Sequence, residues 1–112
     1  MKRVVIESPY SGETERNIAY ARAAVRDSLL RGESPIAWHL LYTQPGILDD
    51  NDANQRQWGI SAGLSWLQAA DAVAVYIDRG ITPNMQSGIA AAEDIHLPVE
   101  YRTVAAKGAA AW

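Results

Sequence analysis

Hydroxyl-bearing residues gather in one short segment, "SPYSG" at residues 8–12, between an apolar run and a stretch with helical spacing. A turn that leads from a strand into a helix presents free backbone N–H groups, and the helix dipole favours negative charge there. The serine and tyrosine hydroxyls add further donors. The segment therefore predicts a site for a phosphate or another anion. The alternative is structural: Ser11 or Thr14 caps the helix, and Gly12 eases the turn.

Acidic residues near the expected strand ends are candidates for acid–base chemistry. Glu7 and Asp78 close two apolar runs, while Asp49, Asp50 and Asp52 lie in a long polar segment. Two carboxyl groups about 5 Å apart suit a retaining displacement at a sugar carbon, and a spacing of about 6.5 to 9.5 Å suits an inverting hydrolysis. For the aspartates of the polar segment, capping of the next helix is the structural alternative.

Aromatic side chains fall near the same ends of the expected strands. Tyr10, Trp38, His39 and Tyr42 can stack on a purine or pyrimidine base. The alternative for Trp38 is core packing, since a tryptophan within a strand is often buried. His39 is a candidate proton shuttle, and the simpler reading is that it only makes hydrogen bonds.

Apolar strand-like runs alternate with helical stretches along the whole chain, which is typical of a parallel α/β sheet. We expect a small flavodoxin- or Rossmann-like three-layer sandwich, with a parallel sheet of about four strands and helices on both faces. Ligands bind such sheets outside the carboxyl ends of the strands. The expected strands are residues 3–7, 35–42, 71–78 and 98–104, and the expected helices are 13–30, 55–70 and 83–95.

Helical periodicity predicts which side of the first helix is buried. Ile18, Ala21, Val25 and Leu29 recur on one face, with the arginines and Asp27 turned elsewhere. Gly32 is expected to end this helix in a left-handed conformation.

The second long helix is apolar on two sides. Ile60 and Leu64 belong to one stripe, whereas Trp58 and Trp66 belong to another that is offset by about half a turn. One stripe can cover the sheet, and the other is expected to form a homo-oligomer interface, where tryptophan is enriched. The alternative is that both indoles lie over the rim of a small core.

Composition limits the classes of function. The 112 residues suffice for one α/β domain, expected at residues 1–104, followed by an Ala-rich tail at 105–112. The chain has no cysteine, and the spacing of its two histidines matches no zinc finger, so neither metal nor cofactor is expected. A net charge of −3 with scattered basic residues argues against duplex nucleic acid. No apolar run is long enough to span a membrane, and we expect a cytoplasmic protein with a small-molecule ligand.

Two adjoining segments, "WLQAADAVAVYID" and "GITPNMQSGIAAAEDIHLPVEY", carry a family resemblance. They resemble the nucleoside 2-deoxyribosyltransferase superfamily, including its deoxynucleoside monophosphate N-glycosidase branch. In that family a helix ending Trp-Leu-x-x-Ala-Asp leads into a central strand, a Gly turn, a helix, and Pro-Val on the last strand. The first strand, the hydroxyl-rich loop and "NIAYARAAV" fall in the matching order, so the resemblance spans most of the chain.

The resemblance places two catalytic carboxylates where this chain has other residues. The family's Glu, which attacks the anomeric carbon or supports the cation formed there, falls on Gln86. The family's Asp falls on Gly63, eight residues before Asp71. An amide is a poor nucleophile and carries no negative charge to stabilise an oxocarbenium-like transition state. The family's mechanism therefore does not carry over as it stands.

Two hypotheses from different classes follow. The first is a bacterial or phage protein that binds a nucleotide or nucleotide-derived molecule without cleaving it, for sequestration or sensing. The second is an N-glycosidase or deoxyribosyltransferase with a relocated carboxylate, for which the catalytic candidates are Glu7, Asp78 and Gln86. A purely structural oligomer is a third reading. The expected ligand-binding residues are Ser8, Pro9, Tyr10, Ser11, Gly12, Asn17, His39, Tyr42, Asp49, Asp50, Asp78, Met85 and Gln86.

Overall fold

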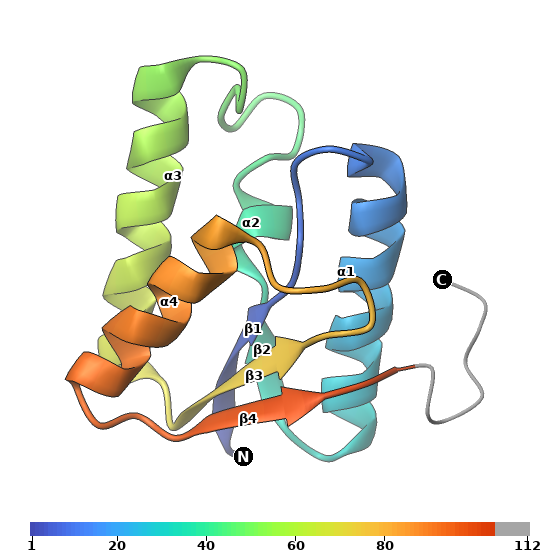
Figure 1. The fold of residues 1–112 in the computed structure, drawn as a ribbon, viewed down its shortest axis with the longest axis vertical. Helices are drawn as coiled ribbons and strands as arrows, with labels where there is room; N and C mark the ends of the chain where they lie inside the picture. The colour runs from blue at the N-terminus through green and yellow to red at the C-terminus, as the bar shows by residue number, and fades with distance from the viewer. Residues whose placement is uncertain (105–112) are drawn as a thin grey trace.

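Four parallel strands form one sheet between two layers of helices in the computed structural model, which describes residues 1–104 (Figure 1). The expected tail at 105–112 lies outside the described residues. In the described part, no helix is long and apolar enough to cross a membrane. The elements are β1 Arg3–Glu7, α1 Thr14–Leu30, β2 Ser34–Ile36, α2 Trp38–Leu41, α3 Ala53–Trp66, the 3₁₀ turn η1 Leu67–Ala69, β3 Ala72–Tyr76, α4 Pro83–Asp94 and β4 Val99–Arg102.

The strand order is β2-β1-β3-β4, and every neighbouring pair is parallel. Val5 pairs with Ile36 of β2 on one side and with Val73 of β3 on the other. This is the order of a flavodoxin-like sheet, in which the chain changes direction between β1 and β3. The predicted fold class is confirmed. The change of direction also fixes where a ligand site belongs, at the carboxyl ends of these two strands.

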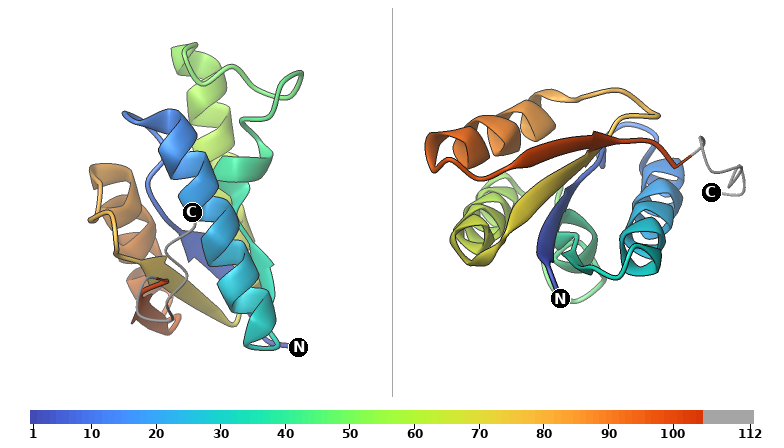
Figure 2. Two further views of the ribbon diagram at one scale, coloured as in Figure 1. Left: turned by 90° about the vertical axis from the view of Figure 1, so that its right-hand side faces the viewer. Right: turned by 90° about the horizontal axis from the view of Figure 1, so that it is seen from below.

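Helices cover both faces of the sheet (Figure 2). On one face, Tyr20 and Ala24 of α1 pack with Ile6 and Tyr76. On the other face, residues of α4 and of the turn after α3 pack against Val5 and its neighbours on β3. Residues 72–76 are all buried, as expected of a central parallel strand.

The predicted second strand, residues 35–42, is wrong beyond its first two residues. β2 ends at Ile36, and the chain turns at Ala37 into the short helix α2. This turn lets Leu40 pack toward α1 while Trp38 packs toward α3, on opposite faces of the sheet. A continuous apolar run does not distinguish a strand from a short buried helix.

The predicted buried face of α1 is also partly wrong. Leu29 is exposed, whereas Asn17 and Asp27 are buried. The carboxylate of Asp27 accepts a hydrogen bond from the hydroxyl of Tyr76, 2.7 Å away, so a polar residue is accommodated in the interior. Gly32 follows the helix in the predicted left-handed conformation, with φ of 82°.

Side-chain caps begin the two helices on the other face. The Thr82 hydroxyl accepts from the backbone N–H of Met85, and Pro83 takes the first position of α4. The Asp52 carboxylate accepts from two N–H groups of α3. The capping role weighed for the polar segment is therefore confirmed at Asp52. α3 begins two residues earlier than the predicted 55–70, and the last predicted turn is a 3₁₀ turn.

Candidate functional site

A cavity of about 390 Å³ opens at the carboxyl ends of the strands. The first turns of α1, α3 and α4 lie at this end of the molecule, together with α2 (Figure 1). The predicted site residues that line the cavity are Glu7, Ser8, Tyr10, Ser11, Gly12, His39, Tyr42, Asp50 and Met85. The topology therefore brings together residues from three separate loops of the sequence.

Glu7 contributes a buried carboxyl group to the cavity wall. It is the last residue of β1, and only 4% of its surface is exposed. Burial raises the pKa of this carboxyl group from 4.5 to about 8, because the charged form loses its hydration. At neutral pH the group is therefore mostly uncharged.

Ser8 and His39 form a buried pair beside Glu7. The serine Oγ lies 2.7 Å from Nε2 of the imidazole. Burial lowers the pKa of His39 to about 4, so its ring is neutral at physiological pH. A neutral imidazole bonded to a hydroxyl can accept or pass on a proton, which makes the pair capable of hydrogen bonding to a ligand and of acid–base chemistry.

Asn17 holds the loop after β1 from behind. Its Nδ2 donates to the carbonyl oxygens of Tyr10 and Ser11, at 3.0 and 3.1 Å. In a trans peptide the C=O and the following N–H point in opposite directions, so the N–H groups of Ser11 and Gly12 point away from Asn17. Nε of Arg79 donates to the side-chain oxygen of Asn17, at 2.8 Å. Asn17 and Arg79 therefore fix the shape of the loop.

The start of α1 is open. Its N-cap residue, Glu13, makes no side-chain cap, and the backbone N–H of Thr14 donates to the carbonyl oxygen of Gly12. The reading in which Ser11 or Thr14 caps the helix is therefore wrong. The part assigned to Gly12 is confirmed, because its φ of 97° is one that side-chain-bearing residues rarely adopt.

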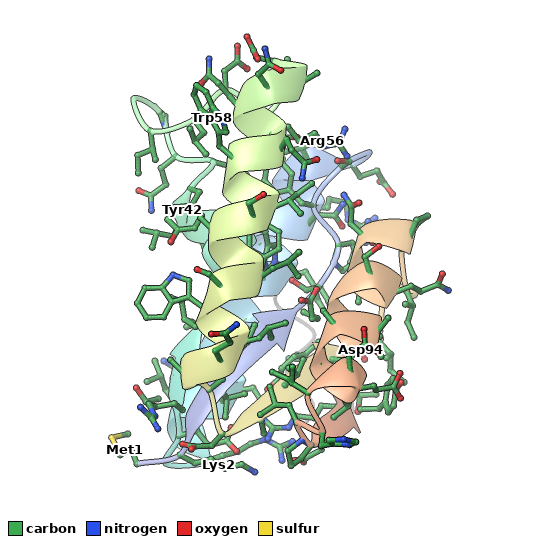
Figure 3. All side chains as sticks on the ribbon, turned by 90° about the vertical axis from the view of Figure 1, so that its left-hand side faces the viewer. Met1, Lys2, Tyr42, Arg56, Trp58 and Asp94 are labelled. Carbon is green, nitrogen blue, oxygen red and sulfur yellow. The ribbon has the colours of Figure 1, made fainter. Side chains whose placement is uncertain are left out.

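The first turns of α3 close the opposite side of the cavity. Nε of Arg56 lies 4.0 Å from a carboxylate oxygen of Asp50, and both residues line the cavity. Arg56 is on the side of α3 that faces the β1–α1 loop, and Trp58 is on the other side (Figure 3). Arg56 supplies a positive charge at the cavity wall, next to the negative charge of Asp50.

Trp38 occupies the space over Gly63 of α3. A Cβ atom at Gly63 would overlap the indole ring, so this position accepts no side chain without displacing Trp38. Trp38 packs against the core and also lines the cavity. Both readings of this residue thus apply: its ring is part of the core, and it is available to a ligand.

Five predicted site residues are not part of the cavity wall: Pro9, Asn17, Asp49, Asp78 and Gln86. Asp78 faces α1, because its carboxylate accepts from the hydroxyl of Tyr20 at 2.9 Å and from the backbone N–H of Val104 at 2.7 Å. Gln86 is exposed on α4. Among the three catalytic candidates, only Glu7 lines the cavity.

Residues 2–102 match the family described as "Domain of unknown function (DUF7768)". The chain belongs to this family. No curated protein matches it. Among solved structures, it is similar to a 2-deoxyribosyltransferase from the psychrotolerant bacterium Bacillus psychrosaccharolyticus, with a TM-score of 0.63 and 16% sequence identity, over 90% of this chain and 72% of that chain.

At this identity the likeness establishes a shared fold, and the resemblance drawn from the sequence is confirmed to that extent. The matching of Gln86 and Gly63 to the family's catalytic positions stays a prediction. Within the described residues, no group of three or more His, Asp or Glu side chains is arranged to hold a metal ion.

Nine residues that the sequence did not indicate also line the cavity of the DUF7768 domain. Four come from α3, and the others come from the long loop and the start of α4. α3 follows a long loop, and the sequence does not indicate where such a helix lies relative to the strand ends. The Thr-Pro start of α4, in contrast, follows a strand, so its place at the cavity could have been predicted. The missed residues are Thr43, Leu48, Gln55, Arg56, Gly59, Ile60, Thr82, Pro83 and Asn84.

Proposed function

We propose that the protein binds a nucleoside, a nucleotide or a small molecule derived from one in the cavity at the carboxyl ends of β1 and β3. The observation that carries the proposal is the buried polar floor of this cavity, formed by Glu7, Ser8 and His39. Polar groups placed in an otherwise apolar cavity at the switch point of a parallel sheet are typical of ligand sites.

The cavity wall offers aromatic residues that can contact the base of such a ligand, and the loop after β1 offers groups that can contact its sugar or phosphate. Tyr10, Trp38 and Tyr42 line the cavity and offer ring faces to a base. Ser11 and Gly12 line it too, and their N–H groups and Arg56 offer partners to a sugar hydroxyl or phosphate. The fold shared with a 2-deoxyribosyltransferase supports a nucleoside-related ligand.

We infer that binding without cleavage is the main activity, in sequestration or sensing within the cytoplasm of a bacterium or a phage-infected cell. The two positions matched to the family's carboxylates support this reading. Gln86 is exposed and outside the cavity wall, and Gly63 lies beneath the indole of Trp38. Neither position offers a carboxylate to a sugar carbon.

Calorimetric titration with adenosine, cytidine and their 5′-monophosphates tests the binding. We expect at least one of the four to bind. We expect Arg56→Gln to weaken binding of the monophosphate more than binding of the nucleoside, because the guanidinium group of Arg56 pairs with the phosphate. Arg22→Gln, an exposed position on α1 away from the cavity, is the matched control. If none of the four compounds gives a heat of binding, the proposal is contradicted.

The second candidate function is cleavage of an N-glycosidic bond, and Glu7 is the observation that favours it. A carboxyl group whose pKa is raised to about 8 still carries its proton at neutral pH and can give it to a leaving base. Water then adds to the sugar carbon and returns a proton to the carboxylate. Chromatography of nucleosides incubated with the protein would show free base, and Glu7→Gln would abolish its release while leaving binding intact.

We further propose that the chain self-associates through α3. Trp58 and Trp66 are 62% and 44% exposed. Trp58 lies on the side of α3 opposite to Arg56, which lines the cavity (Figure 3). The indole N–H of Trp66 donates to the hydroxyl of Tyr42, at 2.8 Å, which fixes the orientation of that ring. Exposed indoles of this size are typical of protein interfaces.

A further inference from the structure

The carboxyl group of Glu7 has no hydrogen-bond partner within residues 1–104, although it is almost fully buried. Buried polar groups in folded proteins are nearly always paired, because an unpaired one loses its hydration without compensation. The carboxyl group lies on the cavity wall. Its missing partner is therefore expected to enter through the cavity.

Gly88 of α4 makes room for this carboxyl group. A Cβ atom at Gly88 would overlap a carboxyl oxygen of Glu7 and come within 2.8 Å of its carboxyl carbon. A glycine inside a helix is destabilising relative to alanine. α4 thus carries a destabilising residue at the position where any side chain would displace Glu7. The carboxyl group of Glu7 is thus accommodated by two elements that are far apart in the sequence, β1 and α4.

The surroundings of Glu7 keep the carboxyl group uncharged at neutral pH. Desolvation is the cause of its raised pKa, which is about 8. Val75 pairs with it on β3, and Gly88 approaches it from α4, so neither of these neighbours brings a charge. The titratable or charged groups that share the cavity are Tyr10, His39, Tyr42, Asp50 and Arg56. Of these, His39 is neutral above about pH 4, and Asp50 and Arg56 lie opposite each other across 4.0 Å.

We propose that Glu7 binds the base of the ligand, by pairing its carboxyl group with a base edge that combines an acceptor and a donor. The O–H donates to a ring nitrogen, and the carbonyl oxygen accepts from the neighbouring exocyclic amino group. Adenine and cytosine present this amidine edge. This inference rests on the proposed nucleoside binding and names the residue that forms hydrogen bonds with the base edge.

The charge state of the carboxyl group decides whether the pair forms. An uncharged carboxyl group has one donor and one acceptor side, whereas an ionised carboxylate only accepts. The ionised form loses the bond to the ring nitrogen and faces its lone pair instead. The rings of Tyr10, Trp38 and Tyr42 line the same cavity, so a base paired with Glu7 has aromatic surfaces within reach.

The first experiment measures adenosine and cytidine affinity at about pH 6.5 and about pH 9.5, since neither base ionises between them. If only the protonated carboxyl group binds, affinity at the higher pH falls about 30-fold. Glu7→Gln replaces the carboxyl group by an amide that keeps one donor and one acceptor at every pH. The variant should bind at both pH values with the pH dependence removed. Glu93→Gln, on the exposed side of α4, is the matched control and should behave like the wild type.

The second experiment compares adenosine with purine riboside, which has the ring nitrogen but no amino group. Loss of the amino donor leaves the buried carbonyl oxygen of Glu7 unpaired, and we expect affinity to fall about 10-fold at about pH 6.5. Far-UV circular dichroism at both pH values checks that every variant stays folded.

The outcomes separate this inference from the proposed function. If no nucleoside or nucleotide binds wild type or variant at either pH, the proposed function fails. If adenosine or cytidine binds with the same affinity at both pH values, Glu7 does not act through its proton and the inference is overturned. Equal binding of adenosine and purine riboside overturns the pairing with the base edge, and leaves nucleoside binding itself intact.

Discussion

Ser8 Oγ and His39 Nε2 lie 2.7 Å apart, and this hydrogen bond joins the loop after β1 to α2. Both residues are buried, with 5% and 7% of their surfaces exposed. The bond therefore pairs two polar groups that have little access to water. It also fixes the position of an imidazole that lines the cavity.

Removing the serine hydroxyl should destabilise the fold. Ser8→Ala leaves a nitrogen of His39 without its partner, and we expect the free energy of unfolding to fall by about 1–3 kcal/mol. Urea denaturation followed by circular dichroism measures it. Ser87→Ala removes an exposed hydroxyl of α4 and is expected to change stability by less than about 0.5 kcal/mol. Equal losses for the two variants would show that the Ser8–His39 bond adds nothing specific.

Two buried groups give stability an unusual dependence on pH. The pKa of Glu7 is 4.5 when unfolded and about 8 when folded, so its contribution is complete below pH 4.5 and is lost as the pH rises to about 8. The pKa of His39 falls from 6.5 to about 4 on folding, so its contribution is present above pH 6.5 and is lost as the pH falls to about 4. The two contributions to the free energy of unfolding change in opposite directions between pH 4.5 and 6.5 and offset each other there. Above pH 6.5 only the contribution of Glu7 changes, so the free energy of unfolding falls.

Urea titrations at a series of pH values test this dependence. From pH 6.5 to about 8, the free energy of unfolding should fall by up to about 1.4 kcal/mol per pH unit. In Glu7→Gln this fall should disappear, because the amide does not ionise. A wild-type stability that rises over this interval would argue that Glu7 ionises freely in the folded protein.

Gly88→Ala tests the close approach of α4 to Glu7. The added methyl group overlaps the carboxyl group, and overpacking of this kind costs about 1–3 kcal/mol of stability. Truncating the carboxyl group removes the overlap, so Gly88→Ala should cost less in a Glu7→Ala background. A double-mutant cycle from urea denaturation gives the interaction energy. If the losses of stability from Gly88→Ala and Glu7→Ala are strictly additive, the added methyl group does not act through contact with the Glu7 carboxyl group.

Gly63→Asp is expected to destabilise the protein rather than restore a catalytic carboxylate. The indole of Trp38 fills the space that the new side chain needs, so either the ring moves or the helix shifts. Together with a buried charge, this should cost about 3 kcal/mol or more. The thermal midpoint of the variant measures the effect. A stable Gly63→Asp protein that releases free base from a nucleotide would instead support a lost family mechanism.

Trp58→Gln tests self-association. Light scattering of the wild type at high protein concentration is expected to give at least twice the monomer mass, because a largely exposed indole on α3 favours contact with a second copy. Trp58→Gln should shift the protein toward the monomer. Tyr101→Gln, at an exposed aromatic residue of β4, is the control. A monomeric wild type would rule out the interface.

The sequence by itself determined the two central strands of the sheet. Residues 3–7 and 72–76 are short apolar runs in a chain that alternates strand-like and helical segments, and they became the two central parallel strands. Since every parallel connection returns the chain to the same edge, the loops that follow the strands had to meet there. Glu7, Ser8 and His39 were predicted at one site on this reasoning, and all three line one cavity.

Tertiary structure decided which polar residues are buried and where the short apolar runs turn. Asp27 is buried because Tyr76, 49 residues later, donates to it, and no periodicity within α1 records that partner. The indole of Trp38 packs closely over α3 because Gly63 leaves space for its ring. Glu7 is mostly uncharged at neutral pH because its carboxyl group is buried in the folded chain, with Gly88 of α4 close against it. Local spacing reports which residues avoid water, whereas pairing and desolvation depend on contacts between distant segments that only the folded chain brings together.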